Sequence, residues 1–176
     1  MQTTDKLECL EKNAVVNGIR LTYFERGMVY RGVKPTLLFV HATGFHARVW
    51  DKIINALGDF HSISVDQRGH GRSEKKKTQH WSEVITDTSE MIEQLDLTNI
   101  IAIGHSMGAH ALIGAAPKAE HRFLKIIAID PVIPEEAAFM DDTPSPFNSA
   151  EQHPTAKRRN EFDSAEEMAE RLKPKG

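Results

Sequence analysis

A G-x-S-x-G pattern between two apolar runs constrains this chain most. Residues 99–103 are mostly branched and apolar, as in a buried strand, and small apolar residues follow Gly108, as in a closely packed helix. A strand that turns sharply into a helix leaves the corner residue strained, with its side chain clear of the backbone, so the residues two before and two after must be small. Gly104 and Gly108 meet that need. The pattern predicts an exposed Ser106 at a helix N-terminus, where backbone N–H groups favour a developing negative charge.

Composition places the chain among ordinary globular proteins. It has 176 residues, of which 40% are hydrophobic, and a net charge of -3, so it can bury one core and shows no feature of a nucleic-acid or anionic-membrane partner. Cys9 is its only cysteine, which excludes an internal disulfide and makes a reducing compartment the default. No window approaches the roughly 18–20 apolar residues of a membrane span. We therefore expect a soluble, cytoplasmic protein with no membrane partner.

Strand and helix patterns alternate along most of the chain. Two short strands are predicted around an Asn17-Gly18 turn, over residues 14–16 and 19–24. Later apolar runs predict buried strands, and apolar residues at helical spacing predict helices between them. The strands are 35–40, 60–65, 99–103 and 124–129, and the helices are 49–57 and 81–95. This order predicts an α/β fold: a mostly parallel sheet with helices on both faces and an antiparallel edge formed by the first two strands.

The carboxyl ends of the predicted parallel strands carry the chemically interesting residues. The segments 41–45, 66–73 and 104–108, together with Asp130, each follow a predicted strand. In open parallel sheets, ligands bind beyond the carboxyl ends of the strands. Four separate stretches of sequence are therefore expected to meet at one edge of the sheet and to form the site there.

The character of the sequence changes after residue 134. Prolines interrupt a charge-rich stretch with no strand pattern, so we divide the chain into a core at 1–134 and a second segment at 135–176. Ser164 and Glu167 form the capping box of a predicted helix, and Pro174 ends it. Its apolar stripe consists of Ala165, Met168, Ala169 and Leu172.

Three motifs together resemble the α/β-hydrolase fold family, and within it the serine esterase-like hydrolases, over about residues 14–134. The segment 41–44 (HATG) is similar to the family's HG-type oxyanion loop, with Ala42 where glycine is usual. The segment 66–73 (DQRGHGRS) matches its D-x-R-G-x-G-x-S loop, and 104–108 resembles its nucleophile elbow. The resemblance implies an α/β-hydrolase core that is incomplete on its C-terminal side, and a helical lid that begins after residue 134. It also implies hydrolysis of a carboxylic ester or related small acyl substrate, with no metal and no cofactor.

The resemblance also implies a role for individual residues. Ser106 would be the nucleophile that forms the acyl-enzyme, and the backbone N–H groups of Thr43 and Met107 would form the oxyanion hole. His41 and His105 are candidates for contact with the substrate. The alternatives are structural: His41 would shape the oxyanion loop, and His105 would be a common filler residue of the elbow. Asp130 is a candidate triad acid, because some family members place the acid after the sixth strand; an Asp-Pro that simply ends the strand is the other interpretation.

The catalytic histidine is the part of the family pattern that this sequence does not place. Three histidines follow Ser106. We expect His110 to pack within a helix, His121 to lie at the amino end of a strand, and His153 to lie in a proline-flanked loop. The hypothesis is therefore that a second polypeptide, or self-association, completes the sheet and the triad. The alternative is a non-catalytic chain that binds a ligand or a partner.

Overall fold

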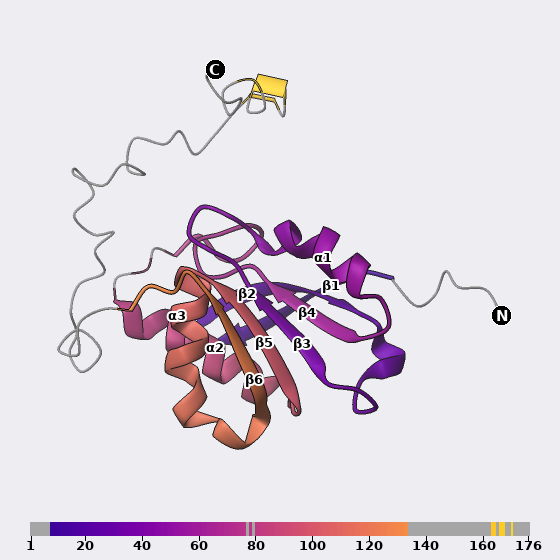
Figure 1. Ribbon diagram of the computed structural model, residues 1–176. Coiled ribbons are helices and arrows are strands. Elements are labelled where there is room, and N and C mark those ends of the chain that lie inside the picture. The colour runs from indigo at the N-terminus through magenta and orange to yellow at the C-terminus, as the bar shows by residue number, and fades with distance from the viewer. Residues whose placement is uncertain are drawn as a thin grey trace. The chain divides into compact units, whose positions relative to one another are not determined.

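The computed structural model describes residues 8–76, 78, 80–133, 163, 164, 166, 167 and 170. Its centre is a six-stranded sheet in the order β1-β2-β4-β3-β5-β6 (Figure 1). The strands are β1 (Leu10–Val16), β2 (Ile19–Arg26), β3 (Thr36–Val40), β4 (His61–Val65), β5 (Ile100–His105) and β6 (Phe123–Ile129). The strands β3 to β6 are parallel, whereas β2 pairs antiparallel with both β1 and β4. The predicted α/β fold with an antiparallel edge is confirmed.

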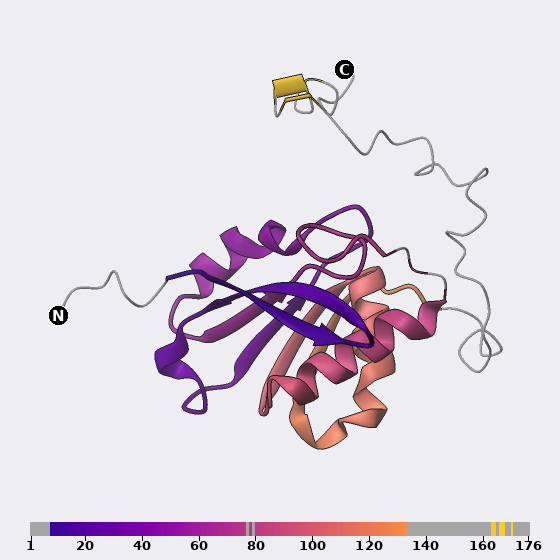
Figure 2. The ribbon, with the colours of Figure 1, turned by 180° about the vertical axis from the view of Figure 1, so that it is seen from behind.

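Helices cover both faces of this sheet. They are α1 (Asp51–Leu57), α2 (Trp81–Gln94) and α3 (Met107–Ala115), and the short 3₁₀ turns are η2 (Met28–Tyr30), η3 (Ala47–Trp50), η4 (Ala116–Lys118) and η5 (Glu120–Arg122). Figures 1 and 2 show α2 and α3 side by side on one face and α1 on the other. Helices are needed on both faces because neighbouring residues of a buried strand point to opposite faces of the sheet, and each face must be covered.

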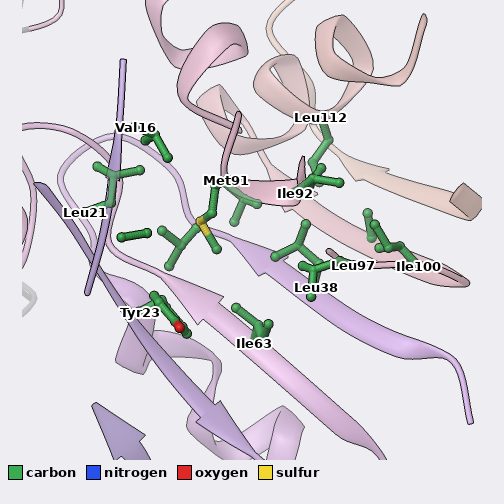
Figure 3. Packing of buried hydrophobic residues seen from close by; sticks show 14 of the residues in the cluster. Val16, Leu21, Tyr23, Leu38, Ile63, Met91, Ile92, Leu97, Ile100 and Leu112 are labelled. Carbon is green, nitrogen blue, oxygen red and sulfur yellow. The ribbon is translucent and has the colours of Figure 1, made fainter. Parts of the chain in front are cut away.

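The alternation of β3 divides the core into two clusters. Leu38 packs with Met91 and Ile92 of α2 in the larger cluster (Figure 3), to which Val40 also belongs. Leu37 and Phe39 point the other way and pack with Trp50 and Ile54 in the smaller cluster. All five residues of β3 are buried, as a continuous apolar run predicts for a central parallel strand.

The first hairpin shows where the sequence pattern under-estimated a strand. Asn17 and Gly18 both have positive φ, 48° and 69°, which is the turn that an Asn-Gly pair favours. β1 begins at Leu10 rather than at residue 14. The sequence pattern missed its first residues because β1 is an edge strand. Its polar residues 11–13 keep their side chains partly in water and so hide the apolar alternation on which the prediction relied.

The second segment is described at only a few residues. Ser164 Oγ accepts a hydrogen bond from the Glu167 N–H at 3.1 Å, and residues 166, 167 and 170 are helical. The Glu167 carboxylate accepts from the N–H of Asp163, at 2.9 Å, rather than from that of Ser164. The Ser164 half of the predicted capping box is therefore present, whereas Glu167 accepts from the residue before Ser164. The stripe residues Ala165, Met168, Ala169 and Leu172, and the predicted lid that begins at residue 135, lie outside the described residues.

A chain of polar side chains, mostly buried, joins β1, β2, β3 and β4 at the amino ends of β3 and β4. His61 Nε2 lies 2.8 Å from Glu25 Oε1, and Thr36 Oγ1 lies 2.9 Å from His61 Nδ1. Lys12 Nζ donates to the other oxygen of Glu25 at 2.6 Å. Burial acts to raise the pKa of Glu25, but the hydrogen bonds from His61 and Lys12 outweigh it and lower that pKa to about 2.

This buried carboxylate should make the stability of the fold depend on acid pH. Because the folded pKa of Glu25 lies below its ordinary value of 4.5, its contribution is present above about pH 4.5 and is lost as the pH falls toward 2. We expect the Glu25→Gln variant to be less stable at pH 7 by roughly 3 kcal/mol and to lose less stability than wild type between those pH values. Urea unfolding at several pH values measures both. The exposed Glu93→Gln is the matched control, and parallel pH profiles for wild type and Glu25→Gln would contradict the prediction.

Candidate active site

Ser106 occupies the sharp corner between β5 and α3. Its φ of 51° and ψ of -114° are a conformation that L-residues rarely adopt. The backbone N–H of Ser106 donates to the carbonyl of Ile129 at 2.9 Å, which joins the corner to the end of β6. The residue is half-buried, so its hydroxyl lies at the surface of the carboxyl edge of the sheet. These observations match the geometry that the G-x-S-x-G pattern predicts.

The two glycines around Ser106 are required by two different contacts. A Cβ atom at Gly104 would lie 2.6 Å from the backbone nitrogen of Ala109, so this glycine lets the helix fold back over its own strand. A Cβ atom at Gly108 would lie 2.3 Å from the carbonyl oxygen of Val40. The second glycine therefore lets α3 touch the end of β3, where the segment 41–44 begins.

The residues predicted to form the oxyanion hole lie in contact with each other. Thr43 Oγ1 lies 3.4 Å from Met107 Sδ, so its hydroxyl donates to the thioether. Within the part of the chain that the structure describes, no group accepts a hydrogen bond from the backbone N–H of either Thr43 or Met107. Met107 is the first residue of α3, and the N–H groups of a first helical turn carry partial positive charge. The two donors are thus available to an anionic oxygen.

The glycine-rich segment 66–73 lies beside this loop and supports it. Asp66 is buried, and its carboxylate accepts from the N–H of Ala47 at 2.6 Å and from the N–H of Arg72 at 2.7 Å. Gly71 has φ of 49°, and a Cβ atom there would lie 2.1 Å from the carboxyl carbon of Asp66. Asp66 therefore joins the chain after the oxyanion segment to the glycine-rich turn, and only glycine fits opposite it.

A buried ion pair fixes the same segment to α2. The Arg68 guanidinium donates twice to the Asp87 carboxylate, at 2.6 and 2.7 Å, and its Nη1 lies 2.7 Å from Glu83. Burial acts to lower the pKa of Arg68, but Asp87 and Glu83 raise it overall, so the side chain stays charged. Sequence reasoning found this segment as a motif but missed its supporting role, because its partners are distant in sequence.

His41 differs from the expectation of a substrate contact. Its ring is fully buried, Nε2 accepts from the N–H of Gln67 at 3.0 Å, and Nδ1 donates to the carbonyl of Ala42 at 2.8 Å. Burial lowers the pKa of His41 to about 4. The structure therefore assigns His41 to the support of the oxyanion segment. His105 is half-buried beside the exposed ring of Phe45, with ring centroids 6.4 Å apart, and its contact with substrate stays a prediction.

Asp130 follows β6 directly and lies next to the corner serine in the sheet register. His105 pairs with Ile129, and the residues that follow them are Ser106 and Asp130. Asp130 is exposed and has φ of 44°, a conformation that Asp tolerates better than most residues. Its place fits both a triad acid and a residue that ends the strand before Pro131, so its catalytic role stays a prediction.

The histidines after Ser106 are not arranged as a catalytic base. His110 is buried in α3, where Nδ1 donates to the carbonyl of Val132 at 3.1 Å and the ring contacts Trp81. His121 lies in η5, before the amino end of β6. His153 lies outside the described residues. In the described part of the chain, no histidine makes a hydrogen bond with Ser106 Oγ.

The described residues contain no cluster of three or more His, Cys, Asp or Glu side chains that could hold a metal ion. None of their helices is both long enough and apolar enough to cross a membrane.

The fold and the site define an α/β protein with a strained, half-buried serine at the carboxyl edge of its parallel strands. A family profile described as alpha/beta hydrolase fold matches residues 35–164, and the chain belongs to that family. It is similar to the 2-(acetamidomethylene)succinate hydrolase of Mesorhizobium japonicum, at 35% identity over 111 residues. That match covers 61% of this chain and 40% of the relative. Esterase YbfF of Escherichia coli is 30% identical over 74 residues, which is 42% of this chain and 29% of the relative.

Solved structures show the same core. The N-formylmaleamic acid deformylase of Pseudomonas putida superposes with a TM-score of 0.59 at 27% identity, over 69% of this chain and 47% of that protein. This chain thus spans less than half the length of these relatives. The relatives establish that the chain has a hydrolase core, and the resemblance predicted from the three motifs is confirmed.

The contact at Gly108 yields a test of the elbow geometry. We expect Gly108→Ala to lower the free energy of unfolding by about 3 kcal/mol, because the new methyl meets backbone that cannot rotate away. Gly18→Ala is the matched control: its Cβ atom would meet nothing within 4 Å, so only its positive φ should cost about 1 kcal/mol. Denaturant unfolding measures both, and equal losses would show that the approach of α3 to β3 is not tight.

Proposed function

We propose that this chain supplies the nucleophile and the oxyanion hole of a serine hydrolase that acts on small acyl substrates through an acyl-enzyme. The observation that carries the proposal is the conjunction at one corner: a strained, half-buried Ser106 and two backbone N–H groups without a partner in the described structure. A serine held only for packing would need neither the strained corner nor the two open donors.

The geometry supports a conventional acyl transfer. Ser106 Oγ attacks the carbonyl carbon of the substrate, and its proton passes to a base. The carbonyl oxygen becomes negative and is held by the N–H groups of Thr43 and Met107, each contributing about 3–4 kcal/mol to the transition state in comparable sites. Collapse of this intermediate expels the leaving group with a proton from the base. Water then attacks the acyl-enzyme by the same steps and frees Ser106.

The activities for which two relatives are named narrow the proposed substrate class. One relative is a hydrolase of 2-(acetamidomethylene)succinate and another removes the formyl group of N-formylmaleamic acid. Both compounds carry an acyl group on nitrogen within a small carboxylic acid. Because a serine nucleophile with an oxyanion hole can attack both esters and amides, we propose small N-acyl derivatives of carboxylic acids beside carboxylic esters.

The base is proposed to come from a second polypeptide or from self-association. Two observations support this. No described histidine makes a hydrogen bond with Ser106 Oγ, and β6 is the edge strand of the described sheet while exposing Leu124, Ile127 and Ile129. An edge with unpaired backbone groups and exposed apolar side chains favours addition of a further strand. The relatives are more than twice as long as the region they share with this chain, so their fold contains material of the kind required.

The reactivity of Ser106 tests the proposed hydrolase. The tagged chain is purified from its own cells with the polypeptides that accompany it and is treated with a fluorophosphonate probe, which requires an activated serine. We expect labelling at Ser106 that is lost in Ser106→Ala and kept in the exposed control Ser82→Ala. Absence of labelling in every preparation would reject the enzyme and favour the non-catalytic binding module.

The isolated chain should not turn over substrate. A serine hydroxyl without an adjacent base is a weak nucleophile, so residues 1–176 alone should hydrolyse a short-chain aryl ester no faster than Ser106→Ala does. The measurement is ester hydrolysis by the purified monomer, with native mass determined in parallel. Substantial turnover by the monomer that is lost on His153→Ala would place the base within this chain and overturn the prediction.

A further inference from the structure

Two histidines from different segments hold the oxyanion segment in a reciprocal way. His70, in the glycine-rich segment, accepts at Nε2 from the N–H of Gly44, at 3.1 Å. His41, in the oxyanion segment, accepts at Nε2 from the N–H of Gln67, at 3.0 Å. Each segment thus contributes one imidazole acceptor and one backbone donor. The two rings meet edge to face, with centroids 5.2 Å apart.

Backbone contacts settle the protonation state of both rings. The Nδ1 atom of His70 lies 2.8 Å from the carbonyl oxygen of Arg68, and Nδ1 of His41 lies 2.8 Å from the carbonyl oxygen of Ala42. A carbonyl can only accept, so each Nδ1 carries a proton, and a backbone N–H can only donate, so each Nε2 is bare. Both imidazoles are therefore neutral. A second proton on either ring would set an N–H against an N–H.

We propose that His41 and His70 form a pH-sensitive clasp on the oxyanion segment, in which protonation of His70 releases Gly44 and frees the neighbouring Thr43 N–H from its fixed direction. His70 is a positioning residue, since it acts through Gly44 and Thr43 rather than on substrate. The structural part of the proposal stands on the hydrogen bonds alone. Its consequence for catalysis rests on the proposed hydrolase function.

The surroundings of the two rings decide which histidine is protonated first as the pH falls. His41 is fully buried, whereas His70 is partly exposed and can take a proton from water. Three groups face His70: the His41 ring, the Asp66 carboxylate and the Lys75 ammonium. Burial and Lys75 lower the pKa of His70 below 6.5, while its hydrogen bond to the Arg68 carbonyl and the charge of Asp66 oppose them. The clasp is therefore closed at neutral pH and opens as the pH falls below the ordinary range of histidine.

Nuclear magnetic resonance of the ¹⁵N-labelled 176-residue chain tests the clasp. At pH 7.5 the His70 ring should appear as the neutral form protonated at Nδ1. On acidification the Gly44 amide resonance should move with the same midpoint as the His70 ring. In His70→Gln, whose side-chain oxygen can still accept from Gly44 but cannot titrate in this range, the Gly44 resonance should become independent of pH. In His70→Leu, which has no acceptor, exchange of the Gly44 amide with solvent should be about tenfold faster at neutral pH.

His46→Gln is the matched control, because this nearby histidine accepts from the N–H of Arg48, whereas the N–H of Gly44 donates to His70. It should leave the titration of Gly44 unchanged. The clasp would be overturned if the Gly44 amide shift did not change at the midpoint of the His70 ring, or if its pH dependence were lost in His46→Gln. The remaining amide resonances report whether each variant is folded. The NMR readout does not involve turnover, so the two proposals can fail separately. If Gly44 titrates with His70 but Ser106 is unreactive, the hydrolase is rejected and the clasp is kept. If Ser106 is reactive but Gly44 does not titrate with His70, only the clasp is rejected.

Discussion

The close approach of α3 to the end of β3 is the constraint on which the candidate site depends. Gly108 lets the helix lie against the carbonyl oxygens of Val40 and His41, and no larger residue fits there without moving the backbone. This contact brings the first N–H of α3 to the segment that carries Thr43, although the two are 64 residues apart. The strain at Ser106 is maintained by the same packing, since the strand before it and the helix after it are both held.

Buried polar groups give the loops at this edge their fixed shape. Asp66 joins the glycine-rich segment to η3, Arg68 joins it to α2 through Asp87, and the two histidines join it to the oxyanion segment. Loops usually lie exposed because their backbone groups need partners. Here side chains supply such partners, so parts of two irregular segments are buried beside Ser106. Rigid donors are what an oxyanion hole needs, since they cost no reorganisation when charge develops.

The edge strand β6 is the part of the sheet where the described core looks incomplete. The faces of β3 and β4 are covered by helices, but Ile127 and Ile129 of β6 remain substantially exposed. A parallel strand is normally buried on both faces. The exposed face of β6 and the absence of a base beside Ser106 among the described residues both support the proposal of further polypeptide next to β6, so we treat sheet completion and triad completion as one proposal.

The sequence by itself determined the fold class, the order of the elements and the sharp strand-to-helix corner at Ser106, because these depend on local patterns: apolar periodicity, the Asn17-Gly18 turn and the glycines two residues either side of Ser106. It did not determine how β1 begins, because the outer face of an edge strand carries no apolar signal. Only the tertiary structure decided that His41 supports a loop rather than facing the surface, and that His70 is its counterpart. Their partners, Gln67 and Gly44, are each 26 residues away, and such pairings are set by how the strands stack rather than by any local pattern.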